Sequence, residues 1–521
     1  MGANGASNNR SWNLKKFLCS WAFFWRLLLL ISVVFYTPLL FWLTDFLQCR
    51  DSAIPRVAER ISTASSSIIA RTATYKDRIP RVTTYAGDLR KLESSWNALS
   101  FGRDYGRRRL KIAVFVKKWP EKDKAGGLER HARTLHCALA KRGHEVHVFT
   151  AIPRDPVEIL RSDKSMHFHF TNYTDPVTMF VNRTEAWATF EAVERRLKFD
   201  IIHTESVCLQ DKYAKGRDNV VVSWHGIAYE IIQSDIVQEF TRDPAEARSS
   251  SLRERVLKVV DEIKFFPHYK HHVATSDSVG DVLRTVYMLP PENIHIILNG
   301  VDEGLFRPNP ARGRAFRATH GVPSDARLVF GMAGRLVKDK GHPLVLRVLR
   351  TLFHDKKNED VYVLIAGDGP WAGRYAELGN NVKVLGPLAS GDLMDFYNAL
   401  DVFVNPTLRS QGMDHTLLEA MMCGKALMAT HFSSITWSAV VSDEFGYTFS
   451  PTYESLKRAF ERVSEDGRAV LEEKGVACRK RASMLFTSDK MASAFERLFL
   501  CIAQGSDKEN VDFCKYPLAT D

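Results

Sequence analysis

The sequence predicts an α/β protein in which two doubly wound, Rossmann-like domains face each other across a cleft, preceded by an N-terminal transmembrane helix. Three observations lead to this fold class. Two series of short apolar runs alternate with stretches of helical periodicity, and a Gly-rich turn follows the first run. An uncharged apolar run lies near the N-terminus. A chain of 521 residues also exceeds what one hydrophobic core usually supports.

The first element is the apolar run at 27–43, LLLLISVVFYTPLLFWL. Its length is near the lower limit for crossing a hydrocarbon core of roughly 30 Å. Arg26 can reach an interface and so extend the span upstream. Because the residues before it carry basic side chains and no acidic ones, we expect a cytosolic tail at 1–16 and a transmembrane signal anchor at 17–44. A cleaved secretory signal and a buried core helix are the alternatives.

The next segment, 45–108, is rich in Ser, Thr and Arg and has no sustained apolar period. We expect a stem that spaces the folded domains from the membrane, with a small helical subdomain packed on those domains as the alternative. Residues 1–110 hold 17 basic and 7 acidic residues, so +10 of the total charge of +11 lies there. The domains are therefore nearly neutral, which argues against nucleic acid as a partner.

The first domain is expected over 109–305 and opens with a strand, a Gly loop, a helix and a strand. RLKIAVFV is a short apolar run, and GLERHARTLHCALAKRG follows the Gly-rich turn with apolar residues at helical spacing. The run HEVHVFT comes next, and this βαβ order implies a parallel sheet. Further strands are expected near 200, 220, 272 and 294.

The second domain is expected over 306–490. Its strand candidates are RLVFGMAGRL, VYVLIAGDG, NVKVLG, DVFVNP and KALMAT, and helical stretches separate them. The cleft between two such domains is the expected ligand site. Residues 491–521 form a C-terminal helix and tail, and the helix SDKMASAFERLFLCIA is expected to cross back to the first domain.

Two cations in the second domain form a candidate phosphate site. Gly334-Arg335 ends a strand, and Lys340-Gly341 begins a helix five residues later. A strand end and a helix N-terminus are positions where cations and backbone amides stabilise the negative charge of phosphate groups.

A second motif, SQGMDHTLLEAMMCG, spans 410–424. Backbone amides from Gly412 onward, before the helix that leads to Glu419, are expected to face a sugar or a phosphate. The first domain contributes Gly126-Gly127, where the lack of side chains lets a ligand approach the backbone, and His225 at a strand end that faces the cleft.

This ordered set of motifs resembles glycosyltransferase family four over residues 109 to about 490. The family has the GT-B fold of two Rossmann-like domains and retains the configuration of the transferred sugar. Its second motif reads Ser-Glu-Gly-Phe-Gly followed by Glu-Ala-Met. Here Gln411 replaces the first glutamate and Met413 replaces the Phe, while Glu419 matches the glutamate that binds the ribose. An amide keeps the hydrogen bonds of a carboxylate but loses its charge. Asp414 is the nearest acid in the sequence that could restore this charge.

The resemblance implies which residues act. His225, Arg335 and Lys340 are the expected catalytic residues. The donor is expected to contact Gly126, Gly127, Gly334, Arg335, Lys340, Gln411, Gly412, Met413, Asp414 and Glu419.

The function implied is retaining transfer of a sugar from a nucleotide sugar to a lumenal glycan, glycoprotein or similar acceptor, with the departing diphosphate taking the proton. No cofactor or metal is expected, because there is no Asp-x-Asp motif and no Cys/His cluster at zinc-ligand spacing. A cytosol-facing enzyme with a lipid-linked acceptor and a non-catalytic GT-B scaffold are the alternatives. We expect a single-pass type II protein of the Golgi membrane, or else of the endoplasmic reticulum membrane.

Overall fold

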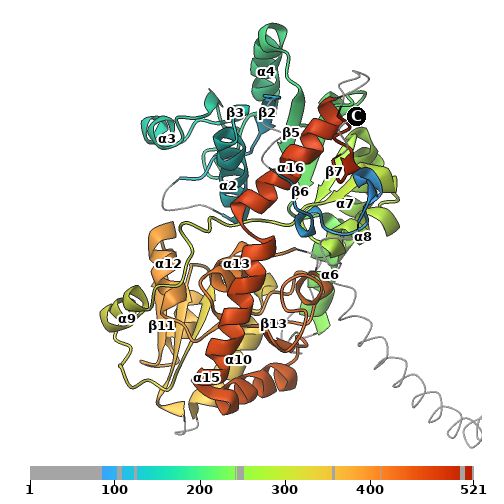
Figure 1. Ribbon diagram of the computed structural model, residues 1–521. Coiled ribbons are helices and arrows are strands. Elements are labelled where there is room, and N and C mark those ends of the chain that lie inside the picture. The colour runs from blue at the N-terminus through green and yellow to red at the C-terminus, as the bar shows by residue number, and fades with distance from the viewer. Residues whose placement is uncertain are drawn as a thin grey trace, which may run out of the picture. The chain divides into compact units, whose positions relative to one another are not determined.

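The computed structural model describes residues 85–102, 108–121, 126–240, 242, 251–354, 358–410, 412–504 and 511–518. The predicted cytosolic tail, the predicted membrane anchor, most of the predicted stem and Gln411 lie outside these residues. The described residues form one compact unit within Val82–Asp521. Two parallel sheets confirm the predicted α/β class (Figure 1).

The first sheet has seven parallel strands in the order β4-β3-β2-β5-β6-β7-β8. Its strands are β2 (Lys111–Phe115), β3 (Glu145–Ala151), β4 (His167–Thr171), β5 (Ile201–Glu205), β6 (Val220–Trp224), β7 (His271–Ala274) and β8 (Ile294–Ile296). Its helices are α2 (Gly127–Lys141), α3 (Pro156–Ser162), α4 (Arg183–Leu197), α5 (Asp211–Ala214), α6 (Ala228–Phe240), α7 (Ser251–Phe265) and α8 (Asp277–Thr285).

The second sheet has six parallel strands in the order β11-β10-β9-β12-β13-β14. Its strands are β9 (Leu328–Ala333), β10 (Val361–Ala366), β11 (Val382–Gly386), β12 (Val402–Asn405), β13 (Ala426–Thr430) and β14 (Gly446–Phe449). Its helices are α9 (Pro310–Thr319), the short η6 (Lys338–Lys340), α10 (His342–His354), α11 (Ala372–Ala376), α12 (Ser390–Asn398), α13 (His415–Met422) and α14 (Ser433–Thr436).

Both sheets reverse their strand order beside the first strand, at β2/β5 and at β9/β12. In a doubly wound sheet this is the point where ligands bind beyond the carboxyl ends of the strands. The predicted boundaries at 108/109 and 305/306 remain predictions.

Two C-terminal helices connect the domains. Helix α15 (Tyr453–Leu485) packs on the second sheet, and α16 (Ser488–Ala503) returns to the first, beside α2 (Figure 1). The apolar side chains of α16, including Phe495 and Phe499, are fully buried with residues of β2 and β3. Burial of these side chains stabilises the packing of α16 on the first domain. The prediction that this helix crosses back to the first domain is confirmed. The chain passes between the two domains near Val301 and again near Thr487, between the two helices. These two residues pair in an isolated parallel bridge.

The described end of the predicted stem, residues 85–102, packs on the first domain instead of extending away. Trp96 and Leu89 are fully buried in the core of this domain. A solvated stem would expose both apolar side chains to water, so their burial favours packing on the domain. Strand β1 (Gly87–Asp88) pairs antiparallel with β15 (Lys515–Tyr516) at the C-terminus.

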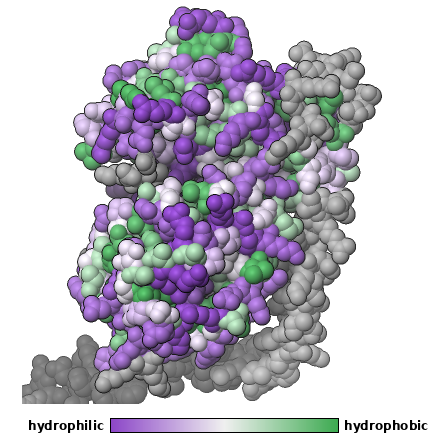
Figure 2. Space-filling model, turned by 60° about the vertical axis from the view of Figure 1, so that its left-hand side comes forward, coloured by the Kyte–Doolittle hydropathy of each residue, from purple (hydrophilic) through white to green (hydrophobic). Residues whose placement is uncertain are grey.

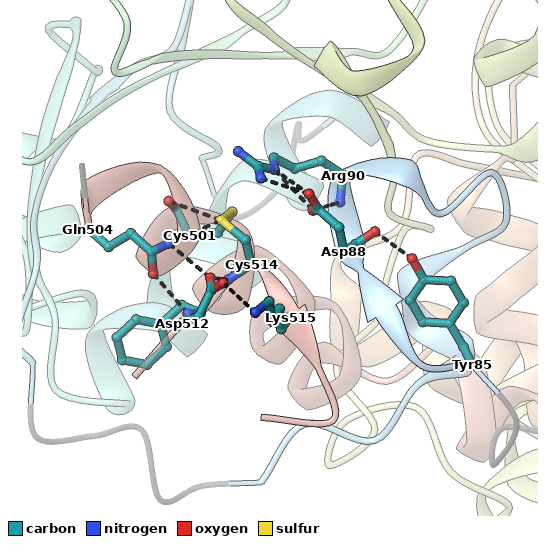
Figure 3. A network of polar contacts seen from close by, with 9 residues as sticks. Tyr85, Asp88, Arg90, Cys501, Gln504, Asp512, Cys514 and Lys515 are labelled. Atoms are coloured by element: carbon teal, nitrogen blue, oxygen red, sulfur yellow. Dashed lines mark hydrogen bonds and ion pairs between the residues drawn. A yellow bond between two sulfur atoms is a disulfide. The ribbon is translucent and has the colours of Figure 1, made fainter. Parts of the chain in front are cut away.

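A disulfide between Cys501 and Cys514 fastens the C-terminal segment to α16 beside this strand pair (Figure 3). The sequence alone did not predict the pairing. On the face seen in Figure 2, hydrophilic residues predominate and hydrophobic ones form scattered patches, as expected for domains whose apolar side chains lie in their cores.

Candidate active site

The candidate site is a cavity of about 930 Å³ between the two domains. From the first domain it is lined by residues that follow β5 and β6, and from the second by residues that follow β9, β10 and β11. Every predicted site residue among the described ones lines it except Glu419. A separate cavity of about 780 Å³, beside α2 and α16, contains none of them.

Two cations line the cavity just after β9, as the sequence predicts. Arg335 is exposed, and no ion pair joins it to another described residue. Gly334, before it, has a φ of +128° with open space where a side chain would stand, so the backbone here is accessible to a ligand. Gly341, after Lys340, has a φ of +77°, and a Cβ there would lie 2.0 Å from the carbonyl oxygen of Pro406. Both turns therefore require glycine.

Lys340 is held by an acid on the loop before α13. Its Nζ donates to the two carboxylate oxygens of Asp414 at 2.6 and 2.7 Å, and Asn405 donates to the same carboxylate at 3.2 Å. Burial raises the pKa of Asp414, but the Lys340 ammonium outweighs it and the pKa is lowered. The carboxylate is thus ionised and charge-compensated, and it is already engaged as a hydrogen-bond acceptor.

The loop before α13 is fixed by contacts to the first domain. The backbone N–H of Gly412 donates to Oε1 of Glu230 at 2.7 Å, and the carbonyl of Met413 accepts from Asn299 at 3.2 Å. Met413 is buried, and Gly412 and Asp414 line the cavity beside it.

Glu419, the predicted ribose ligand, lies beneath the cavity wall. It is buried, and its carboxylate accepts from Tyr397 at 2.7 Å and pairs with Arg130 of helix α2 at 3.1 Å. Arg130 itself lines the cavity and covers this carboxylate from the first domain. The role of Glu419 as a ribose ligand remains a prediction.

His225, at the end of β6, points its Nε2 at a buried carboxylate. The distance to Oε2 of Glu205 is 2.6 Å, and the other oxygen of Glu205 lies 3.2 Å from Nε2 of His136. Burial raises the pKa of Glu205, yet the neighbouring His203 and His131 hold it well below its usual range. An ionised Glu205 fixes the orientation of the His225 ring at the edge of the cavity.

Gly126 and Gly127 lie at the N-terminus of α2, where Gly126 is the N-cap. Gly127 faces the second domain, since a Cβ there would lie 3.7 Å from the ring of His415. A Cβ at Gly126 would instead meet the carboxylate of Glu129 in the same helix, so Gly127 is the one of the two that faces α13.

One group of side chains near the cavity has donor atoms close enough to hold a metal. Donor atoms of His131, Glu205 and His225 all lie within 4.8 Å of one another, and similar groups are His136, His203 and Glu205, and Glu145, His147 and His167. In the first group the Glu205 carboxylate already has histidine partners. The expectation of a metal-free reaction remains a prediction.

Several cleft residues were missed by the sequence analysis. They are Arg130, Glu205, Glu230, Arg409 and His415. Arg130 follows the predicted Gly-Gly turn and Arg409 precedes the predicted Ser-Gln-Gly motif, so proximity in sequence was an available signal for both.

Comparisons with known proteins agree with this geometry. Residues 125–305 match Glycosyltransferase Family 4, and residues 327–466 match Glycosyl transferases group 1. A D-inositol 3-phosphate glycosyltransferase from Catenulispora acidiphila is 30% identical over 170 residues, which cover 30% of this chain and 40% of the relative. A glycosyltransferase from Methanocaldococcus jannaschii is 23% identical over 346 residues, covering 62% of this chain and 80% of the relative. The chain thus spans about two fifths of the length of the first curated relatives.

Solved structures share the fold. Sucrose-phosphate synthase from Thermosynechococcus elongatus has a TM-score of 0.59 at 21% identity, covering 75% of this chain and 98% of that one. Anabaena HepE in complex with UDP-glucose has a TM-score of 0.54 at 18% identity, covering 75% and 99%. Residues 125–305 and 327–466 thus match two glycosyltransferase domain families, and the solved structures show that the chain shares the GT-B fold.

The predicted location is corrected by the same comparisons. The curated relatives include bacterial glycosyltransferases from Catenulispora, Kineococcus and Jonesia, whose cells have no Golgi apparatus or endoplasmic reticulum. The likeness therefore contradicts a type II protein of either membrane. Within the described part of the chain, no helix is both long enough and apolar enough to cross a membrane.

Proposed function

We propose that this chain, with the two domains of a GT-B glycosyltransferase, transfers a sugar from a nucleoside diphosphate sugar to an acceptor hydroxyl and retains its anomeric configuration. The observation that carries the proposal is the pair of cations after β9. Arg335 and Lys340 line the interdomain cavity at a strand end and next to the N-terminus of α10. Positive charge there stabilises a diphosphate as it departs.

The order of the second sheet supports an orientation for the donor. The cavity is lined by Pro387 and Leu388 after β11, by Gly334 after β9 and by Gly412 after β12. In the sheet, β9 lies between β11 and β12. With the diphosphate at Gly334, the apolar β11 end fits the nucleobase and the β12 end, facing His225, fits the sugar.

Glu419 is proposed to bind the ribose hydroxyls when the nucleotide enters. Arg130 neutralises this carboxylate at 3.1 Å, as a buried acid requires. Ribose hydroxyls can replace the hydrogen bonds that Arg130 donates to Glu419.

The reaction needs no dedicated protein base in this proposal. The acceptor hydroxyl attacks from the face that the diphosphate leaves, and a diphosphate oxygen takes the proton. The protein contributes positioning by both domains and charge stabilisation by Arg335 and Lys340. His225, oriented by Glu205, contacts the transferred sugar, and no metal takes part.

The test is an assay of purified protein against a panel of nucleotide sugars, with the released nucleoside diphosphate and the product stereochemistry as readouts. The acceptor panel includes D-inositol 3-phosphate, after which several relatives are named. Arg335→Ala should abolish transfer, while Arg350→Ala, a control on exposed α10 surface, should not. Transfer with inversion would contradict retention.

A scaffold that binds nucleotide sugars without turnover is the second candidate, since Gln411 stands where the family motif has a glutamate. It predicts calorimetric binding of a nucleotide sugar with neither transfer nor hydrolysis by the wild type. Turnover by the wild type that is lost in the Arg335→Ala variant would contradict the scaffold.

A further inference from the structure

Helix α6 of the first domain reaches across the cavity to the loop that contains residue 411. Glu230, in the first turn of α6, accepts from the backbone N–H of Gly412 at 2.7 Å. One turn later, Gln233 accepts from the hydroxyl of Ser410. Residues three apart on a helix share a face, so one face of α6 holds both neighbours of residue 411.

The Glu230 carboxylate belongs to the cavity as well as to this contact. Its side chain is only 2% exposed, yet the residue lines the cavity beside Gly412 and His225. The hydrogen bond to Gly412 uses Oε1, and among the described residues no hydrogen bond or ion pair to Oε2 is found. A sugar at this end of the cavity would meet an acceptor oxygen that is already held in position.

Other acids near this loop are engaged. Both oxygens of Asp414 accept from Lys340, and Oδ2 also accepts from Asn405. The Glu419 carboxylate is shared between Arg130 and Tyr397 and does not line the cavity. Asp414, the acid nearest in sequence to Gln411, is thus committed to the phosphate-site cation, whereas Glu230 has an oxygen left for a ligand.

We propose that Glu230 is the carboxylate that contacts the transferred sugar, with Oε1 holding the loop at Gly412 and Oε2 accepting from a sugar hydroxyl. This inference rests on the proposed function and assigns the sugar end of the donor site. It also accounts for Gln411, because a carboxylate supplied by the first domain replaces the one that the loop lacks. Its charge would favour positive character at the anomeric carbon as the diphosphate leaves.

The first experiment is Glu230→Gln, which preserves size and leaves an amide oxygen to accept from Gly412. We expect kcat for sugar transfer to fall about 100-fold, as when a group that stabilises transition-state charge is removed. The affinity for the nucleoside diphosphate, which lacks the sugar, should change less than threefold by calorimetry. Glu254→Gln on the exposed surface of α7 is the matched control and should leave both quantities unchanged.

A rescue separates contact with the sugar from support of the loop. In the Glu230→Gln background, Gln411→Glu restores the glutamate of the family motif and should recover at least tenfold in kcat. In the wild-type background the same change adds a second acid to the site's sequence and should lower kcat. Unchanged kcat in Glu230→Gln, or an equal loss of nucleoside diphosphate affinity, would overturn the inference. If the Glu230→Gln variant does not fold, the Gln411→Glu single variant still tests the inference. A kcat above that of the wild type in this variant would overturn the role of Glu230.

Failure of the proposed function has a different signature. A wild type that turns over no nucleotide sugar refutes the transferase proposal, whatever the variants do. Normal turnover by both the wild type and Glu230→Gln refutes only the assignment of Glu230.

Discussion

At the scale of single residues, ion pairs between charged groups of the cleft hold its loops. Lys340 pairs with Asp414, and Glu419 with Arg130. Glu419 is buried, whereas Lys340 and Asp414 are partly exposed and line the cavity. Arg130 therefore compensates a buried charge.

The Lys340 pair gives a prediction that separates binding from folding. Lys340→Met should weaken nucleoside diphosphate binding about 10- to 100-fold, as the loss of one charge-assisted hydrogen bond predicts. It should also lower thermal stability, because Asp414 loses its counter-charge. Adding Asp414→Asn should restore the melting temperature but not the affinity. Calorimetry and thermal melts check both, and recovery of affinity in the double variant would contradict a phosphate role for Lys340.

Glu230 predicts the acid side of the pH profile. Burial raises the pKa of this carboxyl, while Arg409 and Lys340 nearby, and the Gly412 N–H, act to lower it and Asp414 adds to the rise. A carboxylate with a raised pKa takes up its proton at a higher pH than an ordinary glutamate. Activity should therefore decline as pH falls through that raised pKa. In Glu230→Gln this acid decline should disappear from the kcat profile, and an identical decline would exclude Glu230 as its source.

The sequence revealed only part of this residue-scale picture. Arg335 and Lys340 could be predicted because they sit at a strand end and a helix start within one short motif. Glu230 could not, because its contact to Gly412 joins residues 182 positions apart. Glu205 could not be predicted either, because its partner His225 lies at the end of the next strand of the sheet. Contacts between residues far apart in the sequence follow from packing, which local patterns do not encode.

At the scale of elements, strands buried on both faces were predictable from continuous apolar runs, such as β2 and β10. In the two large sheets the missed strands are β4 and β14, each at one edge of its sheet. In β4 the sequence HFHFT places partly exposed histidines between phenylalanines, and β14 has only four residues. An edge strand pairs on one side only, so its sequence needs less apolar character.

The turn between η6 and α10 gives an element-scale prediction. Gly341→Ala places a Cβ against the carbonyl of Pro406 at a positive φ, and should cost about 2 to 4 kcal/mol in unfolding free energy. It should also weaken donor binding, because the turn positions Lys340. Gly379→Ala is the matched control, with a φ of +94° but open space, and should cost about 1 kcal/mol and spare binding. Equal effects of the two changes in chemical denaturation would contradict the close approach to Pro406.

At the scale of the whole described unit, the cavity is closed by contacts that join the domains from several sides. Arg130 meets Glu419, Glu230 meets Gly412, and Ser278 meets Ser433 at 3.1 Å. The chain crosses between the domains near Val301 and near Thr487, where the bridge between these residues joins the crossings. The bridge and the three contacts thus hold the two domains together around the cavity.

The contact between Arg130 and Glu419 tests whether the donor takes the place of a protein bridge. Arg130→Met should destabilise the unliganded protein by about 3 kcal/mol, because Glu419 stays buried without its counter-charge. Since the ribose is expected to displace Arg130, the same change should not weaken nucleoside diphosphate binding by more than threefold. Glu419→Gln should weaken that binding at least tenfold, because a carboxylate accepts two ribose hydroxyls better than an amide does. Chemical denaturation and calorimetry measure the two quantities separately. Equal loss of affinity in both variants would make Arg130 a nucleotide ligand and would contradict its displacement by the ribose.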